Sequence, residues 1–163
     1  MRELNIKENN QEVIYMRNKL GLSEYDIEEV ETKIVEMKSQ LLDYRFTFGT
    51  DHFGIKYLLK LHDFLFGDMY YDAGQLSSSY VERDKDEFDK RINRIVALIK
   101  NQDSNIQRIA ELITDLVDAQ IFEDGNSRTI HLFFDNVINC FFPEENDYTR
   151  ALKEEIRKTG RKL

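Results

Sequence analysis

A short polar segment near the middle of the chain carries the residues best suited to chemistry. It separates two apolar stretches of helical periodicity and reads, from Ala119 to Thr129, Ala-Gln-Ile-Phe-Glu-Asp-Gly-Asn-Ser-Arg-Thr. Gly125 permits the positive φ of a tight bend. The backbone N–H groups from Gly125 to Arg128 then lie at the start of the next helix, where unpaired donors and the helix dipole attract anions. Because Arg128 adds a permanently charged fork, the segment predicts a phosphate-binding turn.

Three further side chains suggest what such a turn does. Asp124 is a hard oxygen ligand, placed to hold Mg²⁺ against phosphate oxygens. Asn126 can donate its amide to a phosphate oxygen while its backbone tolerates the bend. Gln120 stands where a catalytic base would be useful, but its neutral amide can only orient a hydroxyl or water. The alternative interpretation is an ordinary corner between two helices, with Asp124 and Asn126 as turn formers.

Helical periodicity accounts for the elements that must position this turn. A single proline and seven glycines leave few places to break an element. We expect helices over 12–20, 23–41, 52–70, 84–100, 104–120, 130–142 and 147–160, with a loop over 45–50. We expect Ser23 to cap the second helix, Asp84 or Asp86 the fourth, Asp103-Ser104 the fifth and Asp147 the last. The sequence therefore predicts a compact all-α bundle of about seven helices, with residues 1–163 forming a single domain.

The composition argues against several classes of function. The chain has 163 residues, 41% of them hydrophobic, and a net charge of −8. No basic stripe offsets repulsion by nucleic acid, and the basic end of the chain (Arg157, Lys158, Arg161, Lys162) is interpreted as a solvated helix end. No apolar stretch approaches the roughly 20 residues that span a bilayer, and no signal peptide is evident. We expect a cytoplasmic protein without membrane contact, leaving export by another route open.

The turn resembles the signature of the Fic family, His-Pro-Phe-x-(Asp/Glu)-Gly-Asn-(Gly/Lys/Thr)-Arg, which ends with a second arginine at the position of His131. The matching residues are Phe122, Asp124, Gly125, Asn126 and Arg128, and the departures are Gln120, Ile121 and His131. Two further phrases, at 18–22 and 61–74, are similar to phrases of the same family and occur in the same order. The resemblance implies an all-α Fic-like fold over most of the chain.

The resemblance also implies an activity. Fic proteins bind ATP with Mg²⁺ at this turn and transfer its adenylyl group to a protein hydroxyl (AMPylation), with a histidine at the position of Gln120 as the base. Losing a general base typically costs about 10²- to 10⁴-fold in rate. We therefore predict a weak or inactive adenylyltransferase that keeps a nucleotide-binding turn and acts by binding or regulation. Its partner would be a protein target, an active Fic relative or an antitoxin. The alternative is an active nucleotidyl- or phosphotransferase or hydrolase, in which Gln120 orients a water or hydroxyl.

Other departures bear on the same question. Ser127 keeps the N–H group that the signature needs, whereas His131 weakens a γ-phosphate contact or is simply a polar residue on a helix face. His52 and His62 are interpreted as helix residues without chemistry. The connector 75–83 has room for at most a vestigial β-hairpin flap, such as a brief strand over 77–81, where active relatives dock a target strand. Only near misses to an inhibitory Ser/Thr-x-x-x-Glu-(Gly/Asn) motif occur, at 32–36 and 78–82.

Overall fold

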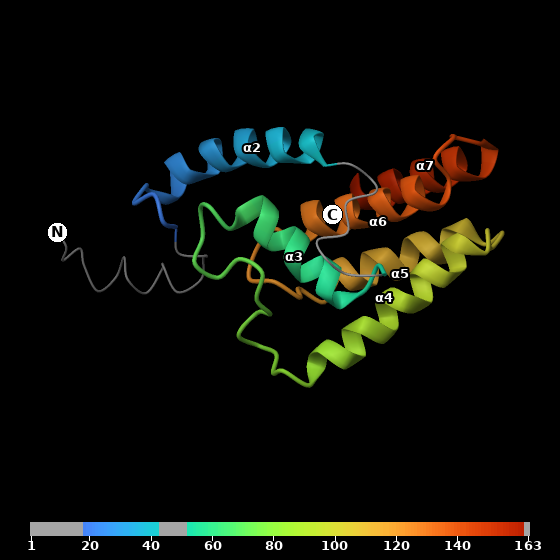
Figure 1. Cartoon of the computed structure of the whole chain (residues 1–163), viewed down its shortest axis with the longest axis horizontal. Helices are drawn as coiled ribbons and strands as arrows, with labels where there is room; N and C mark the ends of the chain where they lie inside the picture. The colour runs from blue at the N-terminus through green and yellow to red at the C-terminus, as the bar shows by residue number, and fades with distance from the viewer. Residues whose placement is uncertain (1–17, 43–51, 162–163) are drawn as a thin grey trace.

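The computed structural model describes residues 18–42 and 52–161, which form six helices and no strand. The helices are α2 (Glu24–Leu41), α3 (Ile55–Phe66), α4 (Asp84–Lys100), α5 (Ile106–Asp118), α6 (Asn126–Phe141) and α7 (Asp147–Arg161) (Figure 1). The predicted all-α class is confirmed. Of the helix predicted over 12–20, only 18–20 are described, and they form a bridge to Tyr70 and a turn instead. The loop predicted over 45–50 lies outside the described residues.

Helix α3 lies at the centre of the fold. Its side chains Leu58, Leu61 and Leu65 are fully buried, and the helix packs against α2, α4 and α6. In Figure 1, α2 lies above α3 and α4 below it. The helix is shorter than the predicted 52–70 at both ends. It begins after Gly54, where the Asp89 carboxylate accepts a hydrogen bond from the Ile55 N–H at 2.8 Å, and it ends at Phe66.

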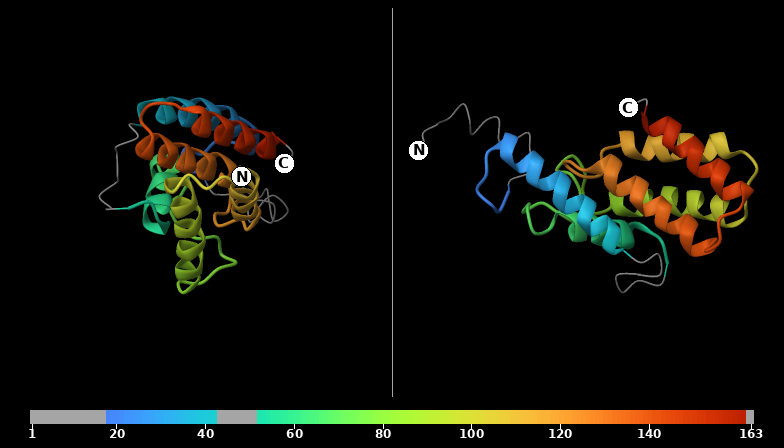
Figure 2. Two further views of the ribbon diagram at one scale, coloured as in Figure 1. Left: turned by 90° about the vertical axis from the view of Figure 1, so that its right-hand side faces the viewer. Right: turned by 90° about the horizontal axis from the view of Figure 1, so that it is seen from above.

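Helices α5, α6 and α7 form the other half of the core. Helix α5 packs against α4, α6 and α7, and α6 and α7 run antiparallel to each other (Figure 2). The expectation that the helices flanking the turn lie inside is confirmed, because Ile113 and Leu116 of α5 and Phe133 and Val137 of α6 are buried. This packing fixes the end of α5 and the start of α6, between which the signature turn lies.

The N-cap of α2 matches the prediction, whereas the N-cap of α5 lies one or two residues from the predicted position. Ser23 caps α2 by accepting from the Asp26 N–H at 3.1 Å, as expected. Helix α5 is capped by Asn105, whose side chain accepts from the Arg108 N–H at 3.1 Å. Asp103 instead accepts from the Asn105 N–H and so shapes the preceding turn. The sequence offered three adjacent polar residues here, and spacing alone did not separate them.

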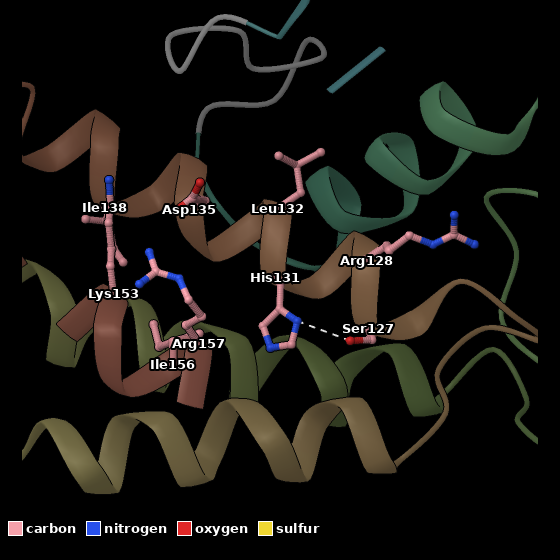
Figure 3. Close-up of a pocket in the computed structure, with 9 residues that line it drawn as sticks. All are labelled: Ser127, Arg128, His131, Leu132, Asp135, Ile138, Lys153, Ile156 and Arg157. Carbon is pink, nitrogen blue, oxygen red and sulfur yellow. Dashed lines mark hydrogen bonds between the residues drawn. The ribbon is translucent and has the colours of Figure 1, made fainter. Parts of the chain in front are cut away.

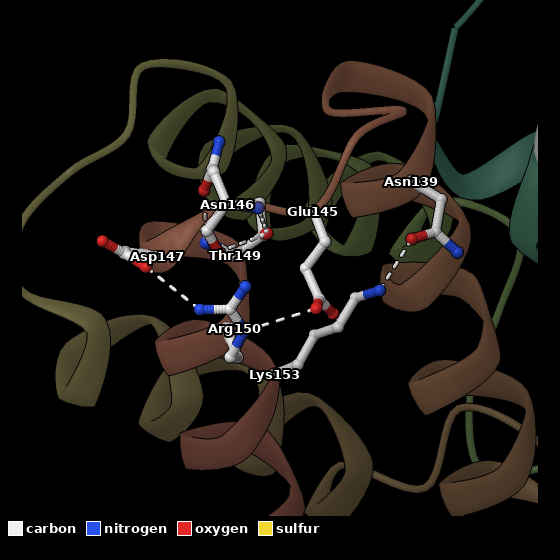
Figure 4. A network of polar contacts seen from close by, with 7 residues as sticks. All are labelled: Asn139, Glu145, Asn146, Asp147, Thr149, Arg150 and Lys153. Carbon is white, nitrogen blue, oxygen red and sulfur yellow. Dashed lines mark hydrogen bonds and ion pairs between the residues drawn. The ribbon is translucent and has the colours of Figure 1, made fainter.

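Helices α4 and α7 also begin differently from the prediction. Asp84 is the first residue of α4 and accepts from the Val81 N–H at 2.7 Å, and no side chain caps the helix at Arg83. Asn146 rather than Asp147 caps α7, because its side chain accepts from the Thr149 N–H at 2.8 Å and Thr149 Oγ1 accepts from the Asn146 N–H at 2.9 Å (Figure 4). This reciprocal pair closes the bend between α6 and α7.

The connector 75–83 is a series of turns without a strand. Its backbone is tied to the signature turn, since the Ser77 N–H donates to the Ile121 carbonyl at 2.7 Å and the Ser78 N–H donates to Glu123 Oε1 at 2.7 Å. The Tyr80 hydroxyl donates to the Ala119 carbonyl. The brief strand considered over 77–81 therefore does not form.

Within residues 18–42 and 52–161, no helix is both long enough and apolar enough to cross a membrane.

Candidate functional site

The signature turn joins α5 to α6 through two residues in the left-handed backbone region. Gln120 has φ +52° just after the end of α5, and Gly125 has φ +77° just before α6. A Cβ at Gly125 would lie 2.7 Å from two ring carbons of Phe66. The positive φ predicted for Gly125 is confirmed, and both the backbone and the close aromatic ring require glycine at this position.

Asn126 closes the turn from within. Its side-chain oxygen accepts from the Phe122 N–H at 2.9 Å, and its amide donates to the Phe122 carbonyl at 2.8 Å. Phe122 itself is buried. One N–H of the Asn126 amide thus holds the turn in shape, and the predicted donation to a phosphate would have to come from its second N–H.

His62 supports the turn from beneath and was missed as a site residue. Its buried ring stacks on Phe122 with centroids 3.9 Å apart. Nδ1 accepts from the Gly74 N–H at 2.9 Å, so Nε2 carries the proton and donates to the Asp124 carbonyl at 3.0 Å. Burial lowers the pKa of His62 to about 4, which keeps the ring neutral near pH 7. His62 lies in helix α3, as predicted, and its hydrogen bonds give it a structural role at the turn that the sequence did not reveal.

Arg128 contacts a buried acid from another helix. Its guanidinium forms an ion pair with Glu31 of α2, which is 5% exposed and also accepts from the Tyr70 hydroxyl at 2.5 Å. The guanidinium lies 5.5 Å from the centroid of the Phe66 ring. Because the Arg128 side chain remains 42% exposed, the fork keeps donors directed to solvent. Sequence reasoning missed Glu31, since nothing distinguishes it from the other acids of α2.

The remaining predicted residues lie on the exposed side of the turn. The side chains of Gln120 and Asp124 are exposed, and one oxygen of Asp124 accepts from the Gly125 N–H at 2.8 Å. Glu123 is engaged with the connector, and the hydrogen bond from Ser78 holds its pKa below the usual value. Over the described parts of the chain, no three His, Cys, Asp or Glu side chains form a group that could hold a metal. Any metal here would need ligands from phosphate or water.

Ser127 and His131 face a pocket along α6. Ser127 Oγ lies 3.2 Å from His131 Nδ1, and burial lowers the pKa of the half-buried His131. The pocket has a volume of about 520 Å³ and lies between α6 and α7 (Figure 3). Arg128 borders it, but Figure 3 shows its side chain extending away from the other lining side chains. The predicted site residues thus lie around the first turns of α6 with different exposures. Gln120, Asp124, Ser127 and Arg128 are exposed, Asn126 and His131 are partly buried, and Phe122 and Gly125 are buried.

Comparison with known proteins agrees with this geometry. A family model described as the Fic/DOC family matches residues 52–138, more than half of the chain. The match runs from the start of α3 through most of α6, so it contains His62, the connector and the signature turn. A search of curated proteins finds no match to the chain. The chain belongs to the Fic/DOC family.

Proposed function

We propose that this protein binds the phosphates of a nucleotide at the turn 120–128 and that Gln120 leaves it with little or no adenylyltransferase activity. The supporting observation is the turn's geometry. Gly125 directs the chain into α6, and the first N–H that bonds back into the helix is that of Thr129, to the Gly125 carbonyl at 3.1 Å. The N–H groups of Asn126, Ser127 and Arg128 precede it and are available to an anion at the positive end of the helix.

Mg²⁺ fits this turn if the protein and the nucleotide phosphates both supply its ligands. Asp124 offers an exposed carboxylate beside the phosphate donors, and Mg²⁺ is usually held by one or two carboxylates together with substrate phosphates and water. The scarcity of other protein ligands is consistent with that mode of binding. When bound, the ion would neutralise phosphate charge, while the chain's own groups fix the position of the phosphates.

The missing base limits chemistry at the site. Gln120 is neutral, and the nearest acid of the turn, Glu123, is bonded to Ser77 and Ser78 of the connector. The connector is tied down where a target segment would have to dock. A protein that binds a nucleotide without transferring it fits a role as partner or regulator of an active Fic relative, an antitoxin or a protein target.

One observation favours a second candidate. Gln120 holds an exposed side chain on a left-handed backbone, and such residues are concentrated at functional sites. An orienting glutamine could then direct a water or hydroxyl at a bound nucleotide, as in some nucleotide hydrolases.

Calorimetry and intact mass together test the proposal. We expect the protein with Mg²⁺ to bind ATP or another nucleotide and its mass to stay unchanged after incubation with ATP, UTP or GTP. Conversion of the nucleotide, or a mass increase of one nucleotidyl group, would favour the second candidate. Absence of binding to every nucleotide at millimolar concentration would contradict the proposed function.

A further inference from the structure

The connector is bonded to the signature turn on both sides of Gln120. The Tyr80 hydroxyl donates to the carbonyl of Ala119, which precedes Gln120. The Ser77 N–H donates at 2.7 Å to the carbonyl of Ile121, which follows Gln120. Because its two ends are attached to the two neighbours of Gln120, the segment between Ser77 and Tyr80 lies next to the residue that stands at the base position.

The two residues between these attachment points form the corner of a β-turn. The Tyr80 N–H donates to the Ser77 carbonyl at 2.9 Å, so Ser78 and Ser79 are the two central residues of the turn. Both serines are exposed. The chain therefore holds two hydroxyl groups of its own in the region where a target hydroxyl would have to approach the site.

The two serines differ in the contacts they make. The Ser78 N–H donates to Glu123 Oε1 at 2.7 Å, and hydrogen bonds from the Ser78 backbone and side chain hold the pKa of Glu123 below its usual value. The Ser79 N–H donates to Ser77 Oγ at 3.4 Å, whereas its hydroxyl makes no hydrogen bond within the part of the chain that the structure describes. Ser79 thus carries the hydroxyl that is available to a base.

From this arrangement we propose that Ser79 is a built-in acceptor for the adenylyl group, and that the connector occupies the place of a target segment. The inference rests on the proposed function, because the signature turn must hold the nucleotide. It adds the acceptor hydroxyl to that site. In the wild-type protein Gln120 cannot take the serine proton, so Ser79 stays unmodified and the connector acts as a pseudosubstrate that keeps other hydroxyls away.

The transfer step balances once a base stands at position 120. Ser79 Oγ forms a bond to the α-phosphorus of ATP as the bond from that phosphorus to the oxygen bridging the α- and β-phosphates breaks. The serine proton passes to the imidazole that Gln120→His introduces, and pyrophosphate leaves with Mg²⁺. Because the acceptor and the base belong to one chain, the rate per molecule does not depend on protein concentration.

Peptide mapping after incubation with α-labelled ATP and Mg²⁺ tests this in the full chain that carries Gln120→His and His131→Arg. We expect label on Ser79, at a rate per molecule independent of protein concentration. Adding Ser79→Ala should lower labelling by about tenfold or more, because other hydroxyls are not held in position. Ser79→Thr keeps a hydroxyl and should keep the label. Ser78→Ala is the matched control, because it removes the neighbouring exposed hydroxyl of the same β-turn.

The outcomes separate this inference from the proposed function. Label on another residue, a rate per molecule that rises with protein concentration, or an equal loss in Ser78→Ala would overturn the inference and leave the proposed function standing. A background variant that binds ATP by calorimetry yet takes no label would also overturn it, because an acceptor held beside a restored base should react. Wild-type protein that binds no nucleotide would overturn both. Circular dichroism of Ser79→Ala checks that lost labelling does not come from misfolding.

Discussion

At the scale of single residues, the site depends on partners that come from distant parts of the sequence. Arg128 was predictable from the signature alone, but its partner Glu31 lies in α2, far along the chain, among acids with identical sequence signals. His62 was visible in a phrase resembling the family, yet only the fold shows that it bonds Asp124 and Gly74. Sequence patterns thus identify residues that face a ligand more readily than the residues that hold them.

The pairing with Glu31 changes what substitution of Arg128 measures. We expect Arg128→Ala to weaken ADP binding by about 1–3 kcal/mol. It should also lower the free energy of unfolding by about 1–3 kcal/mol, less than for a fully buried pair because Arg128 is 42% exposed. Adding Glu31→Gln should recover much of the stability without recovering binding. Urea denaturation and calorimetry on the same three proteins check this, and recovery of ADP affinity in the double variant would show that Arg128 acts only through the fold.

His62 makes stability depend on pH. Its pKa in the folded protein is about 4, below the ordinary 6.5, so the unfolded chain binds more protons between these values. Stability from the neutral ring is therefore fully present above pH 6.5 and is lost as pH falls toward 4, by about 2–4 kcal/mol in total. His62→Phe should keep the stacking on Phe122, lower stability at pH 7 and flatten this dependence. Urea midpoints between pH 4.5 and 7 that fall equally in both proteins would contradict it.

At the scale of elements, long periodic segments were predictable and their ends were not. The apolar faces of α5 and α6 correctly predicted that both helices form and that they lie at the centre of the fold, because a continuous apolar stripe on a helix is buried against the core. The caps depended on which of several adjacent polar residues reaches a helix N–H, as at Asn105 and Asn146. The connector's attachment to the turn had no sequence signal, since it is made largely by backbone groups and one exposed acid.

The connector should loosen when its side-chain anchor is removed. Glu123→Ala deletes the acceptor for the Ser78 N–H but leaves the bond from the Ser77 N–H to the Ile121 carbonyl. We expect faster amide hydrogen exchange at Ser78 with much less change at Ser77, which serves as the internal control. Since the pKa of Glu123 is lowered, the anchor is present above about pH 4.5 and weakens as pH falls below it. Unchanged exchange at Ser78 in the variant would show that the connector is held by other contacts.

At the scale of the whole molecule, the order of the helices brings the turn, the connector, α2 and α7 around one end of α6. The all-α class and the Fic-type turn followed from composition, periodicity and resemblance. The pocket could not be predicted, because it exists only where α7 folds back along α6 (Figure 2). The same packing places Lys153 and Arg157 of α7 in the lining of that pocket.

Assembly of the whole site also limits how far one substitution can restore activity. Gln120→His returns a group with an unperturbed pKa near 6.5, but it leaves His131 in place and the connector 75–83 tied to the turn. Correct positioning of reactants can account for about 7–11 kcal/mol of a barrier. We therefore expect Gln120→His alone to restore little AMP transfer and Gln120→His with His131→Arg to restore more, first as self-modification of a nearby Tyr or Ser.

Transfer of label from α-labelled ATP tests the central claim most directly, when it is measured in parallel for the wild-type protein, Gln120→His and the double variant with His131→Arg. Loss of a general base costs about 10²- to 10⁴-fold, so the wild-type rate should lie at least about a hundredfold below that of the double variant. A wild-type rate within about tenfold of the double variant would contradict the account. It would show that Gln120 supports transfer by orienting the acceptor.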